Sequence, residues 1–141
     1  MRRKYAVLLI VIYLSLLIYW MFFGFSRAAQ SEYMYNLIPF STISHFIQHY
    51  HYRTSVWIIN LIGNVVVFVP FGILLPIIAQ RKLGKHFILF LCGLFILESI
   101  QFLSKRGNFD IDDFILNSLG FYLGYGIYKA MVKSSSIRRK G

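Results

Sequence analysis

Six strongly polar side chains lie within, or at the ends of, three long apolar segments of this 141-residue chain. Carboxylates in such positions can serve as general bases or bind cations, and carboxamides can orient them or donate hydrogen bonds to a ligand. Because polar groups are costly in hydrocarbon, we expect these side chains to face the interior of a helical bundle and to line a site there. They are Asn60, Asn64, Glu98, Gln101, Asp113 and Asn117.

Each of these residues shares a helix face with a partner three or four positions away. On the last apolar segment, Gly120 and Gly124 continue the same stripe. Glycines four residues apart let a neighbouring helix approach closely, so we expect the polar side chains to come within hydrogen-bonding reach of one another. The pairs are Asn60 with Asn64, Glu98 with Gln101, and Asp113 with Asn117.

Composition indicates that the surroundings of these residues are a lipid bilayer. Hydrophobic residues make up 57% of the chain and charged residues 14%, less charge than a water-soluble domain of this size carries. Four continuous apolar runs approach the roughly 20 residues that a spanning helix needs. We therefore predict one all-α membrane domain, a four-helix transmembrane bundle over residues 1–141, with spans at about 5–25, 56–79, 86–103 and 111–131.

The distribution of positive charge predicts the orientation of the bundle. The first apolar run is longer than the roughly 7–15 residues of a signal-peptide core, which favours an uncleaved anchor over a signal peptide. Eleven of the fifteen Lys and Arg residues flank the N-terminus, the connection between the second and third runs, and the C-terminal end. By the positive-inside rule both termini, including a basic tail at 132–141, are expected in the cytoplasm. The predicted pocket then faces outward.

The connection between the first two runs contains a second amphipathic feature. Aromatic and histidine residues in Ser41–Arg53 predict a short interfacial helix. His45 and His49 have a spacing that can bind zinc, but no acidic residue accompanies them in a metalloprotease motif, so we expect surface histidines and no metal. The single cysteine, Cys92, excludes a disulfide framework and a thiolate cluster built from this chain.

Charged residues gather where the third run ends and the fourth begins. Arg106 and Asp110 lie close in sequence to Glu98, and we expect Arg106 to be a counter-ion for the carboxylates or a ligand for an anion. Asp112 and Asp113 also suit the first turn of a helix, where carboxylates cap free N–H groups. Capping and a site role are equal alternatives for Asp112, whereas Asp113 lies on the polar stripe and favours a site role.

Pro70 interrupts the second run below Asn64. A proline removes one helical hydrogen bond and crowds the preceding turn, so the sequence predicts a kink there. The kink either serves packing alone or shapes the floor of the pocket.

Five short motifs follow one another between about residues 36 and 126, and their order and spacing together are specific. They are Asn36-Leu-Ile-Pro-Phe40, Asn60-xx-Gly-Asn64, Phe68-Val-Pro-Phe-Gly72, Glu98-xx-Gln101 and Arg106-xxx-Asp110-xx-Asp113-xxx-Asn117-xx-Gly120. In these motifs the chain resembles the VanZ-like family. The resemblance implies a small membrane protein of the bacterial cell envelope, located in the cytoplasmic membrane and associated with reduced susceptibility to teicoplanin-type glycopeptides, without an established biochemical activity.

Three classes of function are compatible with an outward-facing polar pocket. The favoured one is an accessory role in glycopeptide tolerance, in which the pocket binds an envelope lipid, a cell-wall precursor or a lipoglycopeptide. The alternative is an intramembrane enzyme acting on an envelope lipid or a phosphate-containing precursor, with Glu98 or Asp113 as general base and Arg106 on the phosphate. A transporter ranks last, because the inner halves of the runs are apolar, although an oligomer could build a path that one chain cannot.

As a further alternative to a binding site, the polar residues form a structural clamp, which means that they hold the helices together and bind no ligand. No nucleophile–base pair is recognisable in the chain, so the enzyme interpretation is not favoured. We expect no cofactor and no nucleic acid, since the net charge of +10 lies in short flanks of apolar runs and suits anionic lipids. The candidate pocket residues are Asn60, Asn64, Glu98, Gln101, Arg106, Asp110, Asp113 and Asn117.

Overall fold

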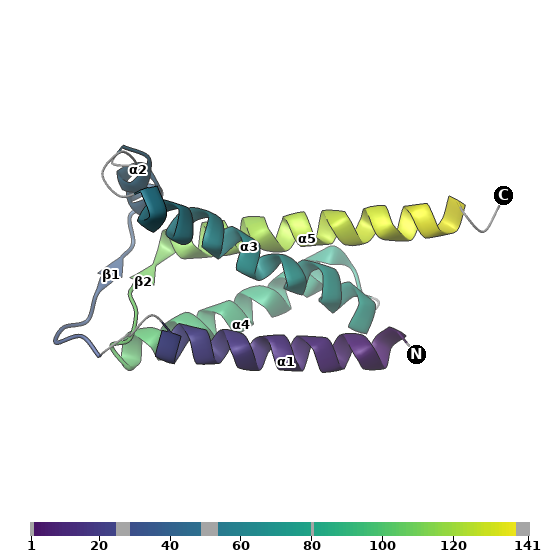
Figure 1. Ribbon diagram of the computed structural model, residues 1–141, viewed down its shortest axis with the longest axis horizontal. Helices are drawn as coiled ribbons and strands as arrows, with labels where there is room; N and C mark the ends of the chain where they lie inside the picture. Colours follow the sequence, from purple (N-terminus) through teal and green to yellow (C-terminus); the bar gives the residue numbers. More distant parts are fainter. Residues whose placement is uncertain (1, 25–28, 49–53, 80, 138–141) are drawn as a thin grey trace.

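Four long helices lie lengthwise in the computed structural model, and a small group of short elements covers one end of them (Figure 1). The structure describes residues 2–24, 29–48, 54–79 and 81–137, with the side chains of 3–24, 29–48, 60–79 and 81–136. Both termini lie at the end opposite the short elements. In chain order the elements are α1 (Arg2–Phe23), β1 (Tyr35–Asn36), α2 (Ser41–Gln48), α3 (Thr54–Ile78), α4 (Leu83–Leu103), β2 (Phe109–Asp110) and α5 (Ile111–Ile137).

Three of the predicted spans are confirmed as helices that are long and apolar enough to cross a membrane. These stretches are Arg3–Phe23, Asn60–Ile78 and Leu83–Leu103. The fourth predicted span is also helical, since α5 begins at Ile111 and continues to Ile137, beyond the predicted end at 131. The α5 helix carries Asp112 and Asp113 in its first turn, which lowers its hydropathy, so a fourth crossing remains a prediction.

The loops at one end are tied together by a strand pair that the sequence did not predict. Strands β1 and β2 are parallel, with Tyr35 opposite Phe109 and Asn36 opposite Asp110. The backbone N–H of Phe109 also donates to the Met34 carbonyl at 3.0 Å. The loop after α1 and the loop before α5 therefore run side by side.

Helix α2 begins at Ser41, as predicted for the interfacial helix. The described helix ends at Gln48, and the rest of the predicted segment, including His49, lies outside the described residues. Its position at a membrane surface remains a prediction. The α3 helix continues through Pro70 and Pro76, and whether Pro70 bends it stays a prediction as well.

Helices α3 and α5 form the closest helix pair of the molecule, through glycines on both. A Cβ atom added to Gly120 would lie 2.0 Å from the Val65 carbonyl oxygen, and one added to Gly124 would lie 2.0 Å from that of Val69. Such distances leave no room for a side chain, so the predicted role of this glycine pair is confirmed. Gly72 on α3 makes the reciprocal approach, because a Cβ there would lie 2.0 Å from the Phe121 carbonyl oxygen.

Aromatic side chains fill the core beside this helix pair. Phe121 is fully buried, and its ring stacks on that of Phe90 with centroids 4.8 Å apart. Phe68 meets Phe90 edge to face at 5.7 Å. On the other side, the Tyr13 hydroxyl of α1 donates a 2.7 Å hydrogen bond to the Val67 carbonyl of α3. Because its core is well packed, this bundle can hold polar side chains at its end in fixed positions.

Candidate functional site

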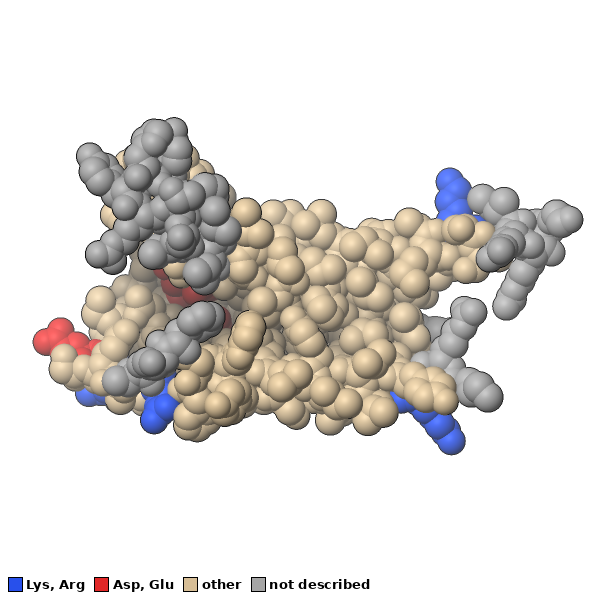
Figure 2. All heavy atoms as spheres, viewed as in Figure 1, with Lys and Arg blue, Asp and Glu red and all other residues tan. Residues whose placement is uncertain are grey.

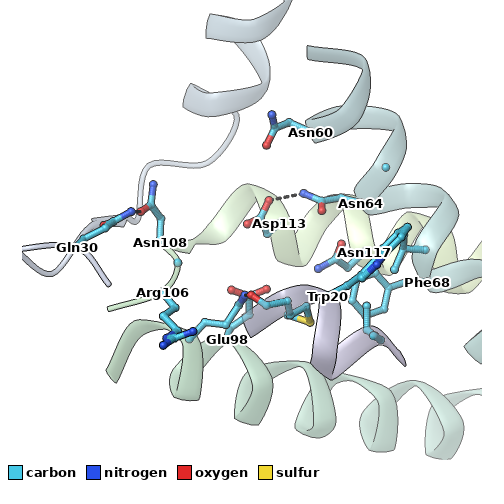
Figure 3. A pocket seen from close by; sticks show the side chains of 16 residues that line it. Trp20, Gln30, Asn60, Asn64, Phe68, Glu98, Arg106, Asn108, Asp113 and Asn117 are labelled. Carbon is cyan, nitrogen blue, oxygen red and sulfur yellow. Dashed lines mark hydrogen bonds between the residues drawn. The ribbon is translucent and has the colours of Figure 1, made fainter. Parts of the chain in front are cut away.

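A cavity of about 450 Å³ lies where the C-terminal ends of α1 and α4 meet the first turns of α5 and the N-terminal half of α3 (Figure 3). Seven of the eight predicted site residues line it, and Asp110 does not. The structure therefore brings together the polar residues of all three segments in which the sequence placed them. The seven are Asn60, Asn64, Glu98, Gln101, Arg106, Asp113 and Asn117.

A short hydrogen bond joins two of these residues across the cavity wall. The Nδ2 amide of Asn64 on α3 donates to Oδ1 of Asp113 on α5 at 2.6 Å (Figure 3). Hydrogen bonds to an ionised acceptor are shorter and stronger than neutral ones, so this contact holds the Asp113 carboxylate in a defined orientation. The expectation that adjacent helices bring their polar groups into contact is confirmed for this pair.

Glu98, Gln101 and Asn117 are the most deeply buried polar side chains of the cavity. Glu98 is 4% exposed and Asn117 is 1% exposed. Among the residues that the structure describes, no group donates a hydrogen bond to Oδ1 of Asn117. A buried amide oxygen without a donor is unusual in proteins and is expected at positions that meet water or a ligand.

Gln101 and Arg106 both hold the C-terminal end of α1. The Nε2 amide of Gln101 donates to the Met21 carbonyl at 2.9 Å, and Nη1 of Arg106 donates to the Phe22 carbonyl at 2.8 Å. These are terminal carbonyls that a helix leaves without an intrahelical partner, at the negative end of its dipole. Both side chains thus fix one wall of the cavity, a role the sequence did not indicate. The predicted role of Arg106 as counter-ion remains a prediction.

Asp110 lies in a separate polar cluster next to the strand pair. Its carboxylate accepts hydrogen bonds from Thr42 Oγ1 at 2.6 Å and from Asn36 Nδ2 at 3.2 Å. It also accepts from the backbone N–H of Asp112 at 2.9 Å, so it caps the start of α5. Asp110 therefore connects α5 to the loop before α2 and does not line the cavity itself.

Asp112 caps a helix other than its own. Its carboxylate is fully buried and accepts from the backbone N–H groups of Phe40 at 2.5 Å and Ile43 at 3.0 Å, at the start of α2. Capping was one of the two alternatives for this residue, and it is the one observed, although for α2 rather than α5. Phe40 has a positive φ of 63°, which non-glycine residues adopt only where the surrounding contacts enforce it.

The apolar wall of the cavity comes mainly from α1 and α3, and of its members the sequence analysis named only Phe68, as part of a motif. On α1 the wall includes Leu17, Trp20 and Met21, and on α3 it includes Val67 and Phe68. The continuously apolar α1 segment carries no periodic signal that would mark one of its faces. The loop residues Gln30 and Asn108 add two carboxamides to the lining.

Charged side chains are visible on the surface of the molecule near its two ends. Figure 2 shows acidic atoms recessed in a hollow at the end that carries the short elements. Basic side chains are visible at both ends of the molecule. Among the described residues, no group of three or more His, Cys, Asp or Glu side chains is placed to hold a metal ion.

These features define a class, that of helical membrane proteins whose long helices enclose an amphiphilic cavity at one end. Within this class the chain belongs to the VanZ/LLP1 family, which matches residues 10–133. The family expected from the motifs is thereby confirmed.

A relative of known name supports the same assignment. The chain is 31% identical over 127 residues to Protein VanZ of Enterococcus faecium. The matched region covers 85% of this chain and 71% of that protein. No solved structure matches this chain.

Proposed function

We propose that this protein contributes to tolerance of teicoplanin-type glycopeptides from the bacterial cytoplasmic membrane, through the cavity that Glu98, Asp113 and Asn117 line. In this proposal the cavity binds an envelope lipid, a cell-wall precursor or a lipophilic ligand. The observation that carries it is the combination, in one cavity, of buried polar side chains with an apolar wall. The family membership supports the link to glycopeptides.

The composition of the lining favours an amphiphilic ligand. Leu17, Val67 and Phe68 offer apolar contacts, whereas Glu98 and Asn117 offer hydrogen-bonding groups out of contact with bulk water. Pockets of several hundred cubic ångströms with a few well-placed polar groups suit small molecules or lipid headgroups. A purely structural clamp would place polar groups against one another without leaving such a volume between them.

The topology that goes with this proposal has four crossings, with both termini in the cytoplasm and the cavity facing outward. With 27 residues, α5 is about 40 Å long, sufficient for a bilayer core of about 30 Å. Arg81 and Lys82 lie between α3 and α4, and Lys85 lies in the first turn of α4, at the end of the molecule where the chain also begins and ends. Positive charge on that side favours a cytoplasmic location.

The proposal is tested by replacing Glu98 with Gln, which keeps the shape of the side chain and removes its charge. The variant and the wild-type protein are expressed in a susceptible bacterium, and teicoplanin susceptibility and membrane abundance are both measured. We expect Glu98→Gln to lose tolerance at normal abundance. Glu32→Gln is the matched control, because Glu32 is exposed and does not line the cavity. Loss of abundance with Glu98→Gln would indicate the structural clamp instead.

An intramembrane enzyme is the second candidate, and one observation favours it. Two carboxylates, Glu98 and Asp113, line the same cavity as the guanidinium group of Arg106, which suits a phosphate-containing substrate. Purified protein is incubated with envelope lipids in vesicles, and the lipids are searched for altered masses. A product that requires Glu98 would establish catalysis, and the absence of one would leave binding as the function of the cavity.

A further inference from the structure

Two helix faces, one on α1 and one on α3, meet beside the cavity and then separate. Tyr13 and Trp20 lie on one face of α1, and Gly63 and Val67 lie on one face of α3, by their spacing. The Tyr13 hydroxyl donates to the Val67 carbonyl at 2.7 Å, so the two faces touch at this level. One turn closer to the short elements, a Cβ atom added to Gly63 would have no described atom within 4 Å apart from the backbone of its own helix and its chain neighbours. The two helices therefore draw apart between Val67 and Gly63.

The separation leaves an opening in the side of the bundle. Figure 1 shows α1 and α3 close together near the end where the chain begins and further apart near the short elements. At the wider level, Trp20 of α1 and Asn60 of α3 line the cavity and are both exposed, Trp20 by 59%. Figure 2 looks across the long helices, and from that direction acidic atoms are visible in a hollow. The described residues thus leave the cavity open between α1 and α3.

The end of the cavity beyond the helices is lined by loop residues that are bonded to one another. Gln30, Arg106 and Asn108 of this lining belong to the loops after α1 and before α5. The backbone N–H of Gln30 donates to the Lys105 carbonyl at 2.8 Å, and Nζ of Lys105 donates to the Ser31 carbonyl at 2.8 Å. A ligand that came along the helix axes would meet these joined loops, whereas one that came between α1 and α3 would not.

The side opening lies at the depth of lipid chains when the bundle crosses a bilayer. Leu17 and Phe68 line the cavity and belong to the apolar stretches Arg3–Phe23 and Asn60–Ile78. At about 1.5 Å per residue they lie about 9 and 12 Å inside the ends of these stretches. One leaflet of the hydrocarbon core is about 15 Å thick, half of about 30 Å. The cavity therefore extends through most of one leaflet, and its opening meets lipid chains.

From this geometry we infer that the cavity takes its ligand sideways from the outer leaflet, between α1 and α3, and that a hydrocarbon chain of the ligand lies against Leu17, Val67 and Phe68. The polar end of the same molecule lies beside Glu98 and Asn117. The inference rests on the proposed function, because it names the class of ligand for the same cavity. That class is an amphiphile resident in the membrane, as opposed to a solute from the medium.

The test maps where lipid chains contact the full-length protein. The protein is reconstituted into vesicles of phosphatidylglycerol that contain a small fraction of phosphatidylcholine with a diazirine in the middle of one acyl chain. Light releases nitrogen from the diazirine, the carbene that remains inserts into a nearby bond, and mass spectrometry of peptides locates the adducts.

Buried residues provide the comparison within one protein. Leu17 and Phe68 are buried and line the cavity, whereas Phe90, Leu94 and Phe121 are also buried and do not line it. We expect severalfold more adducts on the first two residues than on the other three. Equal labelling of the two groups would overturn the inference.

A variant that fills the opening assigns the route. Gly63→Leu should reduce labelling of Leu17 and Phe68 severalfold, because the new side chain enters the open space beside α1. Gly93→Leu is the matched control, since Gly93 does not line the cavity and also has open space at its Cβ position among the described residues. Thermal unfolding of both variants verifies that they are folded. Labelling that persists in Gly63→Leu would overturn the inference.

A water-soluble probe distinguishes a membrane ligand from a solute. The same vesicles without the lipid probe are illuminated with photoleucine, a diazirine amino acid that has no long chain. It should label the loop at Asn108 and leave Leu17 and Phe68 unlabelled. Labelling of these two residues as strong as that by the lipid would assign the cavity to solutes and overturn the inference.

The outcome is separable from that of the proposed function. Loss of teicoplanin tolerance in Glu98→Gln, together with equal lipid labelling of the two groups of buried residues, would refute only the membrane ligand. Lipid labelling of Leu17 and Phe68 that Gly63→Leu removes, without any effect of Glu98→Gln on tolerance, would refute only the role in tolerance.

Discussion

Asn64 and Asp113 lie 49 positions apart in the chain, and the amide of one donates to the carboxylate of the other at 2.6 Å. The contact joins α3 to α5 at the cavity, while Val65, the residue after Asn64, makes its close backbone approach to Gly120 further along the same helix pair. Close packing of the two backbones thus brings the amide within reach of the carboxylate. The same two helices, α3 and α5, therefore form this wall of the cavity and the closest contact between helices.

Replacing Asn64 by Ala should destabilise the protein by about 1–3 kcal/mol, because the half-buried carboxylate of Asp113 then loses the hydrogen bond from Asn64. The midpoint of thermal unfolding in detergent measures the effect. Combining Asn64→Ala with Asp113→Ala should cost less than the sum of the two single changes, as expected for residues in contact. Strict additivity would contradict the hydrogen bond. Asn108→Ala is a suitable control, since its exposed amide oxygen accepts a longer 3.5 Å bond from Gln30.

Replacing Gly120 or Gly124 by Ala should separate α3 from α5. The added Cβ would lie 2.0 Å from a carbonyl oxygen of α3 in either case, and overpacking of this kind typically costs about 1–3 kcal/mol or more. Membrane abundance and thermal stability should both fall. Gly126→Ala is the matched control on the same helix, because the added Cβ would have no atom within 4 Å apart from the backbone of its own helix and its chain neighbours. Alanine is also the better helix former, so equal effects at the three positions would contradict the packing.

Replacing Asp112 by Ala should release the start of α2. The N–H groups of Phe40 and Ile43 lose their acceptor, and a lost helix cap costs about 1 kcal/mol, or about fivefold in local opening. Hydrogen exchange should therefore accelerate at these two amides. Exchange within α4 should be unchanged, because among the described residues the hydrogen bonds of this carboxylate go to the start of α2. Unchanged protection at Phe40 would refute the capping role.

Labelling of introduced cysteines should establish the orientation of the bundle. Asn108→Cys at the cavity end should react with an impermeant thiol reagent in intact cells, whereas Leu83→Cys at the opposite end should not. A Cys92→Ser background removes the natural thiol, which is exposed on α4. The reverse pattern of labelling would place the cavity in the cytoplasm and refute an outward-facing site.

Sequence patterns were sufficient for the long helices and for most of the polar residues that line the cavity. The ends of the helices follow from where apolar composition stops, and α3, α4 and α5 each begin within about three residues of the predicted positions. The stripe from Asp113 to Gly124 placed the polar pair and the close backbone contact on one face, as observed. Local spacing carries this information because a helix repeats its geometry regularly.

Contacts between side chains and distant backbone groups could not be predicted in this way. Gln101 and Arg106 are directed at carbonyls of α1, and a carbonyl has no signature in a sequence. The same holds for Asp112, whose donors are the N–H groups of another helix. The strand pair was missed because two residues are too few to show the alternation typical of a strand.

The carboxylate of Asp112 also has a consequence for biosynthesis. It meets the N–H of Phe40 across 72 positions of the chain, and almost every residue between them must be made before the two can touch. A nascent protein emerging from the ribosome therefore carries an α2 without its cap until the final helix follows. Truncated products that end before α5 should leave this segment open to proteases, which lets quality control recognise an unfinished chain.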